Sequence, residues 1–405
     1  MMTQNEFLEV ILGFSKPWYI ESVVQSSESI EIKLNYPRGT KFICPHCGKA
    51  NNAYDNKWKT YRHMDWWQYK TFIKVKIPRI KCCQSTETVV VPWLRPGSKF
   101  TQMMEMHIVE VAKCGAISKQ AKILRISDTR LWRVVRYWVD KSRERADYSQ
   151  VTNAGIDETS KKGHNYITNF VDLDKRKVMY VANGKDSNTI TEFTRDFEQH
   201  NGVPDNIQNV TSDMSLAFES GIKDNFKNSD IIIDKFHVIK GFNDALNKTL
   251  RDDIKAGHDF KKSKYIWAKN PENLTVKQTE RFESMNKQRS KTAKAYQIKI
   301  AMQEIYRLTD KFEAEAQLFK LVSWMKRSRN EHMKKLAKTI VNHWNNILNY
   351  FDNRLTNAIL EGINNIVQNI KHTARGFKNY DYFKTIIYLY CGAFEVTVGQ
   401  TTHTK

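Results

Sequence analysis

Residues 151–240 carry the pattern that most constrains the fold, because short alternating runs and helical apolar spacings follow one another there in a definite order. Alternation predicts strands at 153–158, 166–172, 177–182, 207–212 and 230–233. Helical spacing predicts helices at 189–199 and 216–223, and the polar turn 174–176 predicts a hairpin between the second and third strands. Three strands, a helix, a strand, a helix and a strand indicate a mixed α/β core.

The segments on either side of this core have other patterns. Residues 1–98 mix β-like runs, such as 29–34 and 71–80, with a cysteine pair, and Pro92, Pro96 and Gly97 suggest a boundary after them. We expect a multidomain α+β chain with these parts: a β-rich module at 1–98, a helix-turn-helix at 99–148, the first part of the core at 149–240, an α-helical insertion at 241–350, and the second part of the core at 351–405, with helices at 352–371 and 381–390.

The helix-turn-helix prediction rests on residues 101–140. A helix at 103–114 is broken at Gly115, a short helix at 118–124 follows, and Ser127 is a suitable N-cap for a third helix. Leu131, Val134, Val135 and Trp138 give the third helix an inward stripe. Its other face carries the candidate DNA-binding residues Arg130, Arg133 and Arg136. The alternative interpretation is a solvated basic helix in a bundle.

The charge of the chain suggests a polyanionic partner. Its 65 Lys and Arg against 44 Asp and Glu give a formal net charge of +21, which favours double-stranded DNA through counterion release. A membrane surface is the alternative, but the longest apolar stretch, at 385–396, is about half of the roughly 20 residues that a membrane helix needs. Residues 1–14 lack the features of a signal peptide, so we expect a cytoplasmic protein that lies on the bacterial nucleoid when bound to DNA.

The cysteines suggest a structural zinc site in the β-rich module. Cys44, Cys47 and Cys82 are the candidate Zn²⁺ ligands. A second Cys-x-x-Cys pair would need cysteine where Ser85 stands, and we expect adjacent Cys82 and Cys83 not to share one ion. His46 or His63 is then the expected replacement ligand, and ordinary buried thiols are the alternative to zinc.

Three carboxylates form the candidate catalytic centre. Asp157 and Asp213 end the first and fourth predicted strands, which would bring them together if those strands are neighbours. Glu361 lies on the late helix, one turn from Asn357 and from Asn364. Carboxylates converging from two strands and a helix suit Mg²⁺ or Mn²⁺ and phosphoryl transfer. Lys371 and Arg375 would then hold the scissile strand by its phosphates.

Taken together, these motifs resemble the DDE transposases of the ISL-three insertion-sequence family, which have an RNase H-like catalytic core. The resemblance covers nearly the whole chain and includes Cys44-Pro-His-Cys47-Gly, Gly155-Ile-Asp157-Glu158-Thr, Ser212-Asp213-Met-Ser, Asp234-Lys-Phe-His237-Val and Asn357-x-x-x-Glu361-Gly-x-Asn364-Asn. It implies that Asp157, Asp213 and Glu361 bind the metal. It also implies that Asp234 and His237 support the ligands or contact DNA, and that the insertion fills the long gap before Glu361.

The same resemblance implies a function and a mode of assembly. We expect a transposase that binds terminal inverted repeats, cleaves DNA and joins the freed end to target DNA, acting as a homodimer or larger assembly. Two alternatives use the same features: an RNase H-like nuclease or resolvase that only cleaves, and a helix-turn-helix regulator without catalysis.

Overall fold

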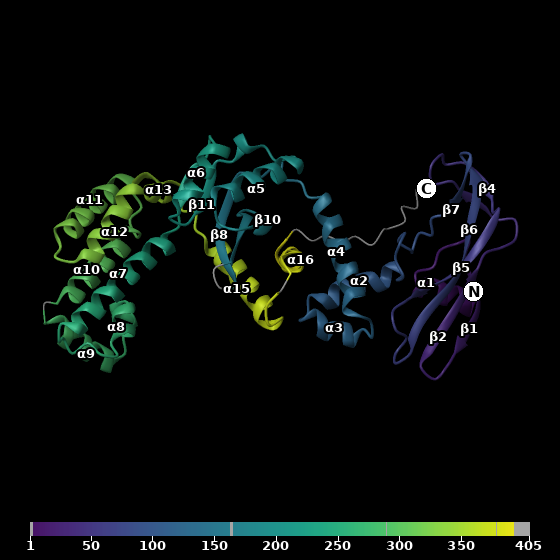
Figure 1. The fold of residues 1–405 in the computed structure, drawn as a ribbon, viewed down its shortest axis with the longest axis horizontal. Coiled ribbons are helices and arrows are strands. Elements are labelled where there is room, and N and C mark those ends of the chain that lie inside the picture. The colour runs from purple at the N-terminus through teal and green to yellow at the C-terminus, as the bar shows by residue number, and fades with distance from the viewer. Residues whose placement is uncertain (1–2, 163–164, 289, 378, 393–405) are drawn as a thin grey trace. The chain divides into compact units, whose positions relative to one another are not determined.

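The computed structural model describes residues 3–162, 165–288, 290–377 and 379–392 (Figure 1). The chain divides into two compact units, one within Met1–Arg143 and the other within Glu144–Ala393. Within the described ranges, no helix combines the length and apolar character that crossing a membrane requires.

The first unit begins with a β-rich module, as expected. Its main sheet has the order β1-β2-β6-β5, with β7 paired to the far end of β6. On β6 the side chains of Ile73, Val75 and Ile77 alternate into the core, which explains why the sequence pattern predicts this strand. The elements of the module are α1 (Gln4–Ile11), β1 (Tyr19–Gln25), β2 (Ser29–Asn35), β3 (Lys41–Ile43), β4 (Ala50–Asn52), β5 (Asp55–Arg62), β6 (Lys70–Cys82) and β7 (Ser85–Thr88).

Three helices follow in the first unit, and they confirm the predicted helix-turn-helix. They are α2 (Gln102–Ala112), α3 (Ile117–Ile123) and α4 (Asp128–Glu144). Gly115 between α2 and α3 has a φ of 154°. The Ser127 carbonyl accepts the first hydrogen bonds of α4, and Leu131, Val134 and Val135 are buried beneath that helix. The apolar stripe therefore faces inward, and the arginine face of α4 remains outside.

A buried carboxylate holds these helices together. Glu105 of α2 is fully buried and accepts hydrogen bonds from Arg95 at 2.7 Å, from Ser98 at 2.5 Å and from Trp138 of α4 at 2.8 Å. Burying a carboxylate without such partners would be costly. The stretch after Pro92 is thus bonded to α2, and through Glu105 to α4.

The second unit is built on a five-stranded sheet with the order β10-β9-β8-β11-β12. β8, β9 and β10 are antiparallel neighbours, whereas β11 is parallel to both β8 and β12. This is the sheet expected of an RNase H-like core, and the predicted neighbourhood of the first and fourth strands is confirmed. The elements are β8 (Asn153–Lys162), β9 (Asn165–Asp172), β10 (Lys177–Asn183), α5 (Ser187–Gln199), β11 (Asn209–Ser212), α6 (Leu216–Asn225) and β12 (Asp230–Ile233).

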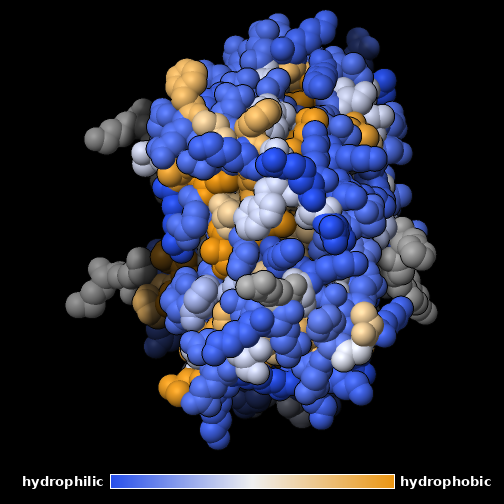
Figure 2. Space-filling view, turned by 90° about the vertical axis from the view of Figure 1, so that its left-hand side faces the viewer, coloured by the Kyte–Doolittle hydropathy of each residue, from blue (hydrophilic) through white to orange (hydrophobic). Residues whose placement is uncertain are grey.

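A helical segment follows β12, and its large apolar core also includes Ile232 and Ile233 of that strand. Its first helix starts directly after the strand, earlier than the expected boundary at 241. Figure 2 shows a mostly hydrophilic face of the molecule on which apolar side chains are also exposed. The helices are α7 (Lys235–Lys255), α8 (Lys264–Ala268), α9 (Val276–Asn286), α10 (Lys291–Ile305), α11 (Lys311–Arg327), α12 (Glu331–Asn342), α13 (Trp344–Leu348) and α14 (Tyr350–Asn353).

The chain returns to the sheet through α15 (Ala358–Thr373) and α16 (Tyr380–Cys391). The expected single helix at 352–371 is wrong at its start, because Arg354 takes a left-handed conformation with a φ of 54° and separates α14 from α15. The expected helix at 381–390 is confirmed as α16. The hydroxyls of Tyr380 and Tyr388 bond the carbonyl and amide of Val181, so α16 covers the edge of β10.

Candidate active site and metal centres

Two aspartates lie side by side in the core sheet. β11 pairs with β8 so that Asn209, Val210 and Thr211 face Asn153, Ala154 and Gly155. The same register, continued two residues beyond Thr211, places Asp213 beside Asp157. Asp157 lies in the middle of β8 and not at the end of the strand as expected, because β8 and β9 stay paired as far as Lys162.

The helix α15 packs closely on β8 and so brings its side chains to Asp157. A Cβ at Gly155 would lie only 2.5 Å from Cδ1 of Leu360, so the glycine is what allows α15 to approach. Asn364, one turn after Leu360, donates from Nδ2 to Asp157 Oδ2 at 2.6 Å. Its own Oδ1 accepts from Thr159 at 2.5 Å and Asn169 at 3.3 Å. Asn364 therefore fixes the orientation of the Asp157 carboxylate.

Thr159 and Asn169 both bond Asn364 at the candidate site, and neither was expected there from the sequence. Asn169 lies directly opposite Asp157 in the β8–β9 pair, and both it and Thr159 are buried polar residues in the interior of strands. Polar residues buried inside strands usually have a specific hydrogen-bond partner. The sequence signal that could have identified Asn169 is therefore a polar residue inside the predicted strand 166–172, whereas Thr159 lies beyond the predicted strand 153–158.

Burial makes both aspartates harder to ionise. Asp157 is 6% exposed, and burial, opposed by hydrogen bonds from the Glu158 amide and Asn364, raises its pKa to about 6, with the charges of Asp234 and Glu158 adding to the rise. Burial likewise raises the pKa of Asp213, together with the charges of Glu158 and Asp157, while His237 opposes the rise. A bound cation would favour the ionised form of both carboxylates.

Asp234 is a third aspartate next to this pair. It follows β12 at the N-cap position of α7 and is 1% exposed, but its side chain makes no capping hydrogen bond to that helix. Instead Oδ1 accepts from the backbone amide of Asn357 at 3.2 Å. Among the described residues, Oδ2 of Asp234 and both amide atoms of Asn357 are buried without a hydrogen-bond partner. These three polar atoms are therefore left without a hydrogen bond in the described part of the chain.

Glu361 lies in the first turn of α15 and is exposed. It lines a pocket of about 480 Å³ together with Asp234, Lys235, Tyr306 and Arg307. No three carboxylates in the described ranges have oxygens that all lie within 4.8 Å of one another. The charge of Asp157 acts on Asp213, and the charge of Asp234 acts on Asp157, while Asp234 lines the same pocket as Glu361. The structure thus places Glu361 beside Asp234, and does not bring it into a close cluster with Asp157 and Asp213.

The other predicted residues of the core have distinct environments. His237 is half-buried in the first turn of α7, where its charge acts on Asp213, so it lies at the site and not in the apolar core. Lys371 donates to the Ser160 carbonyl at 2.8 Å and thus ties α15 to β8. Arg375 is exposed with a φ of 56°, and its guanidinium has no partner in the described part of the chain.

The arginines of α4 are on the surface of the first unit. Arg130 and Arg133 are exposed and make no hydrogen bond or ion pair with any described residue. Arg136 lies 3.7 Å from Asp140, one turn further along the helix. Two unpaired guanidinium groups near the start of a helix that ends a helix-turn-helix are well placed to bind a polyanion.

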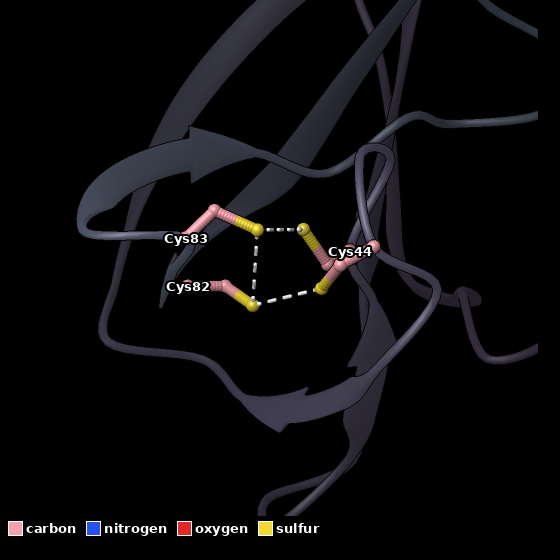
Figure 3. A group of neighbouring side chains, drawn as sticks. Cys44, Cys82 and Cys83 are labelled. Carbon is pink, nitrogen blue, oxygen red and sulfur yellow. Dashed lines mark hydrogen bonds between the residues drawn. The ribbon is translucent and has the colours of Figure 1, made fainter.

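The first unit also contains a group of four thiols, shown in Figure 3 with dashed lines between sulfur atoms. The Sγ–Sγ distances are 3.9 Å from Cys44 to Cys83, 3.3 Å from Cys47 to Cys82 and 3.8 Å from Cys82 to Cys83. All four sulfur atoms lie within 4.8 Å of one another. Tetrahedral zinc with Zn–S bonds of about 2.3 Å separates its sulfurs by about 3.8 Å, so this group fits a structural zinc ion.

This geometry speaks against the expectation that adjacent Cys82 and Cys83 would not share one ion, and a set of four thiols needs no histidine. Cys82 and Ser85 pair across the β6–β7 hairpin, whose two loop residues, Cys83 and Gln84, have φ angles of 53° and 60°. Two left-handed residues make a type I′ turn, and this turn places both sulfurs on the same side. His63 is instead buried and bonded to Thr101 at 2.7 Å.

The environment of the cluster favours a thiolate at Cys47, whereas hydrogen bonding to Cys47 raises the pKa of Cys82 and raises that of Cys83 to about 12. Hydrogen bonding from the Lys49 backbone, with further bonding to Cys82 and Cys83, lowers the pKa of Cys47 to about 7. The thiolate is the form of cysteine that binds metal. One member of the cluster is thus partly ionised near neutral pH even before an ion binds.

Comparison with protein families and with known proteins finds matches to the β-rich module, to the helix-turn-helix and to the second unit. A family model described as transposase matches residues 154–387, a helix-turn-helix domain of transposase family ISL3 matches 89–139, and the zinc-finger of transposase IS204/IS1001/IS1096/IS1165 matches 40–84. The chain is 24% identical over 373 residues to the transposase for insertion sequence element IS1557 of Mycobacterium tuberculosis, which covers 83% of this chain and 82% of that protein. It is 23% identical over 377 residues to the transposase for insertion sequence element IS1001 of Bordetella parapertussis, which covers 86% and 88%.

Proposed function

Because this chain belongs to the ISL3 family of transposases, we propose that it binds the terminal inverted repeats of an insertion sequence and catalyses metal-dependent cleavage and strand transfer of DNA. The observation that carries the proposal is the parallel register of β8 and β11, which when continued places Asp213 beside Asp157, with α15 bonded to Asp157 through Asn364. Asp157, Asp213 and Glu361 are the proposed ligands of Mg²⁺ or Mn²⁺, which prefer carboxylate oxygens.

The chemistry would be two phosphoryl transfers at one site. A bound divalent ion would activate the attacking oxygen and stabilise the leaving oxygen. In the first transfer water attacks a phosphodiester at the element's end, and the broken bond leaves a free 3′-hydroxyl. In the second that hydroxyl attacks a phosphodiester of the target DNA, and the target's 3′-oxygen leaves. Asn364 would keep the Asp157 carboxylate oriented through both steps, and the unpaired Arg375 would bind a phosphate of the strand being cut.

The proposal is tested by incubating the purified protein with Mg²⁺ or Mn²⁺ and labelled duplexes that carry the element's own ends and a target sequence. Products shorter than the substrate report cleavage, and products longer than the substrate report joining. Cleavage without joining would make the protein a nuclease or resolvase, and end binding without either would make it a regulator.

Recognition of the ends is the proposed role of Arg130 and Arg133, since both are exposed and unpaired among the described residues. Replacing both with alanine is expected to weaken binding to the element's ends by about 1–3 kcal/mol for each base that an arginine recognises. Titration of labelled end duplex and of unrelated duplex at one salt concentration measures the difference. Lys113→Ala is the matched control, because Lys113 is paired with Glu110 on α2 at 2.8 Å. Equal affinity of the double variant and wild type for the ends would remove α4 from end recognition.

The rate of cleavage is expected to fall as the pH drops through about 6, because the pKa of Asp157 is raised to about 6 and a protonated carboxylate does not bind a cation. The ionised form is present above that pKa and is lost below it. Initial rates measured across this range at two Mg²⁺ concentrations should show a midpoint that moves to lower pH with more Mg²⁺. Asn364→Ala should move the midpoint upward, because the Asn364 hydrogen bond lowers the pKa of Asp157. A midpoint independent of Mg²⁺ would assign the titration to another group.

A further inference from the structure

We propose that the loop 66–69 of the β-rich module is a second DNA-contacting element, in which Trp67 enters the minor groove beside the major groove read by α4. The partner is the duplex at an element's end, so this inference rests on the proposed function. The inference concerns Trp67, which lies on a different element of the first unit from the zinc cluster and from the arginines of α4.

The conformation of Trp67 is unusual for its residue type. Trp66 and Tyr69 exchange two backbone hydrogen bonds of 3.1 and 3.0 Å and so close a two-residue loop. Trp67 is the first of the two loop residues and has a φ of 53°. Glycine is the residue favoured at such a position, and a bulky side chain with positive φ is an outlier.

The side chain of Trp67 gains little burial in return. It is 82% exposed, more than any other large apolar side chain among the described residues. The Trp66 ring lies edge-on to it with 6.3 Å between the centroids. Strained residues persist where the surrounding structure holds them, and they are concentrated at functional sites. An exposed tryptophan held in this way therefore points to a partner outside the chain.

The loop is bonded to the helix-turn-helix at the turn before α4. Arg125 lies in that turn and donates from Nη1 to the Gln68 carbonyl at 2.8 Å and from Nε to Asp65 at 3.1 Å. A second link joins His63 to Thr101, the residue that caps α2. The backbone next to Trp67 is thus fixed against the turn that leads into α4.

The charges around the loop favour a polyanion as the partner. Asp65 forms ion pairs with both Arg62 and Arg125, so one carboxylate lies between two guanidinium groups. Arg130 and Arg133 of α4 follow this turn and have no partner among the described residues. Apolar wedges that proteins insert into the minor groove are flanked by basic contacts to the phosphates, and the Trp67 loop is joined through Arg125 to the turn that leads to these arginines.

The test uses the full-length protein and compares Trp67→Gly, Trp67→Phe and Tyr54→Ala. Glycine suits the positive φ, so Trp67→Gly should keep the fold, zinc content and thermal unfolding temperature of wild type. We expect Trp67→Gly to lower the affinity for the end duplex by roughly 5- to 150-fold and Trp67→Phe to retain most of it. Tyr54 is the matched control, because it is 58% exposed and precedes β5, at the opposite end of that strand from the 66–69 loop.

Hydroxyl-radical footprints of the end duplex locate the contact. Trp67→Gly should lose protection at one minor-groove patch, while Arg130→Ala with Arg133→Ala weakens binding at the neighbouring positions. Unchanged affinity and footprint for Trp67→Gly, alongside weaker binding by the arginine variant, would overturn this inference and leave the proposed function intact. Unchanged DNA binding with altered self-association would make Trp67 a protein contact and would also overturn it. If neither variant alters binding, end recognition by this whole surface fails.

Discussion

Asp157→Asn, Asp213→Asn and Glu361→Gln are each expected to bind the element's ends as wild type does and to lose at least about a thousandfold in the rates of cleavage and joining. Each substitution keeps the size of the side chain and removes a negative charge from the proposed metal site. Metal ions contribute several kcal/mol to phosphoryl transfer, and about 1.4 kcal/mol corresponds to a factor of ten in rate. At Asp157 the new amide oxygen can still accept the Asn364 hydrogen bond that connects β8 with α15, so the fold should be preserved.

The measurement is the rate of each product's formation under single-turnover conditions, together with end-binding affinity and thermal unfolding of every variant. Asp205→Asn is the control, because Asp205 is an exposed carboxylate in the short helix at Pro204–Asn206. Wild-type rates in any one of the three variants would remove that residue from the proposed centre. In that event Asp234 would be the first replacement to test, because its buried Oδ2 has no partner among the described residues and it shares a pocket with Glu361.

The order of elements in the core could be predicted because each element has a local signature. Alternation in the strands and helical spacing in α5 and α6 depend on neighbouring residues only. The break between α14 and α15 could not be predicted in this way. It depends on Arg354, whose left-handed conformation is accompanied by a hydrogen bond from its guanidinium to the Tyr306 carbonyl, and Tyr306 lies on a different part of the chain.

Part of the candidate site could also be predicted from the sequence. Asp157 and Asp213 could be placed together once β8 and β11 were taken as neighbours, because register then follows from strand geometry. The supporting role of Asn364 followed from its helical spacing to Glu361. The position of Asp234 depends on a hydrogen bond to Asn357 across 123 residues of sequence, and the Asp65–Arg125 ion pair spans 60 residues. Interactions at such separation leave no local pattern, so sequence reasoning could not find them.

Cys83→Ser is expected to lower the zinc affinity by more than about 100-fold and to destabilise the first unit. Cys83 lies 3.9 Å from Cys44 and 3.8 Å from Cys82 by their Sγ atoms, so serine removes one of four thiols from the cluster. Changing a residue that merely supports a metal ligand already costs 10–100-fold in affinity, and removing a ligand costs more. The free energy of binding to a structural zinc site is also free energy of folding, so thermal unfolding of the first unit should begin at a lower temperature.

Zinc per protein chain, measured after dialysis against a weak chelator, distinguishes the two ligand sets that the sequence allowed. If the four thiols bind zinc, Cys83→Ser loses the ion while His46→Ala and His63→Ala retain it. Cys114→Ser is the matched control, because Cys114 is an exposed cysteine outside the cluster. Retention of zinc by Cys83→Ser together with its loss from a histidine variant would restore the ligand set expected from sequence. It would also mean that the type I′ turn at Cys83 and Gln84 serves the β6–β7 hairpin alone.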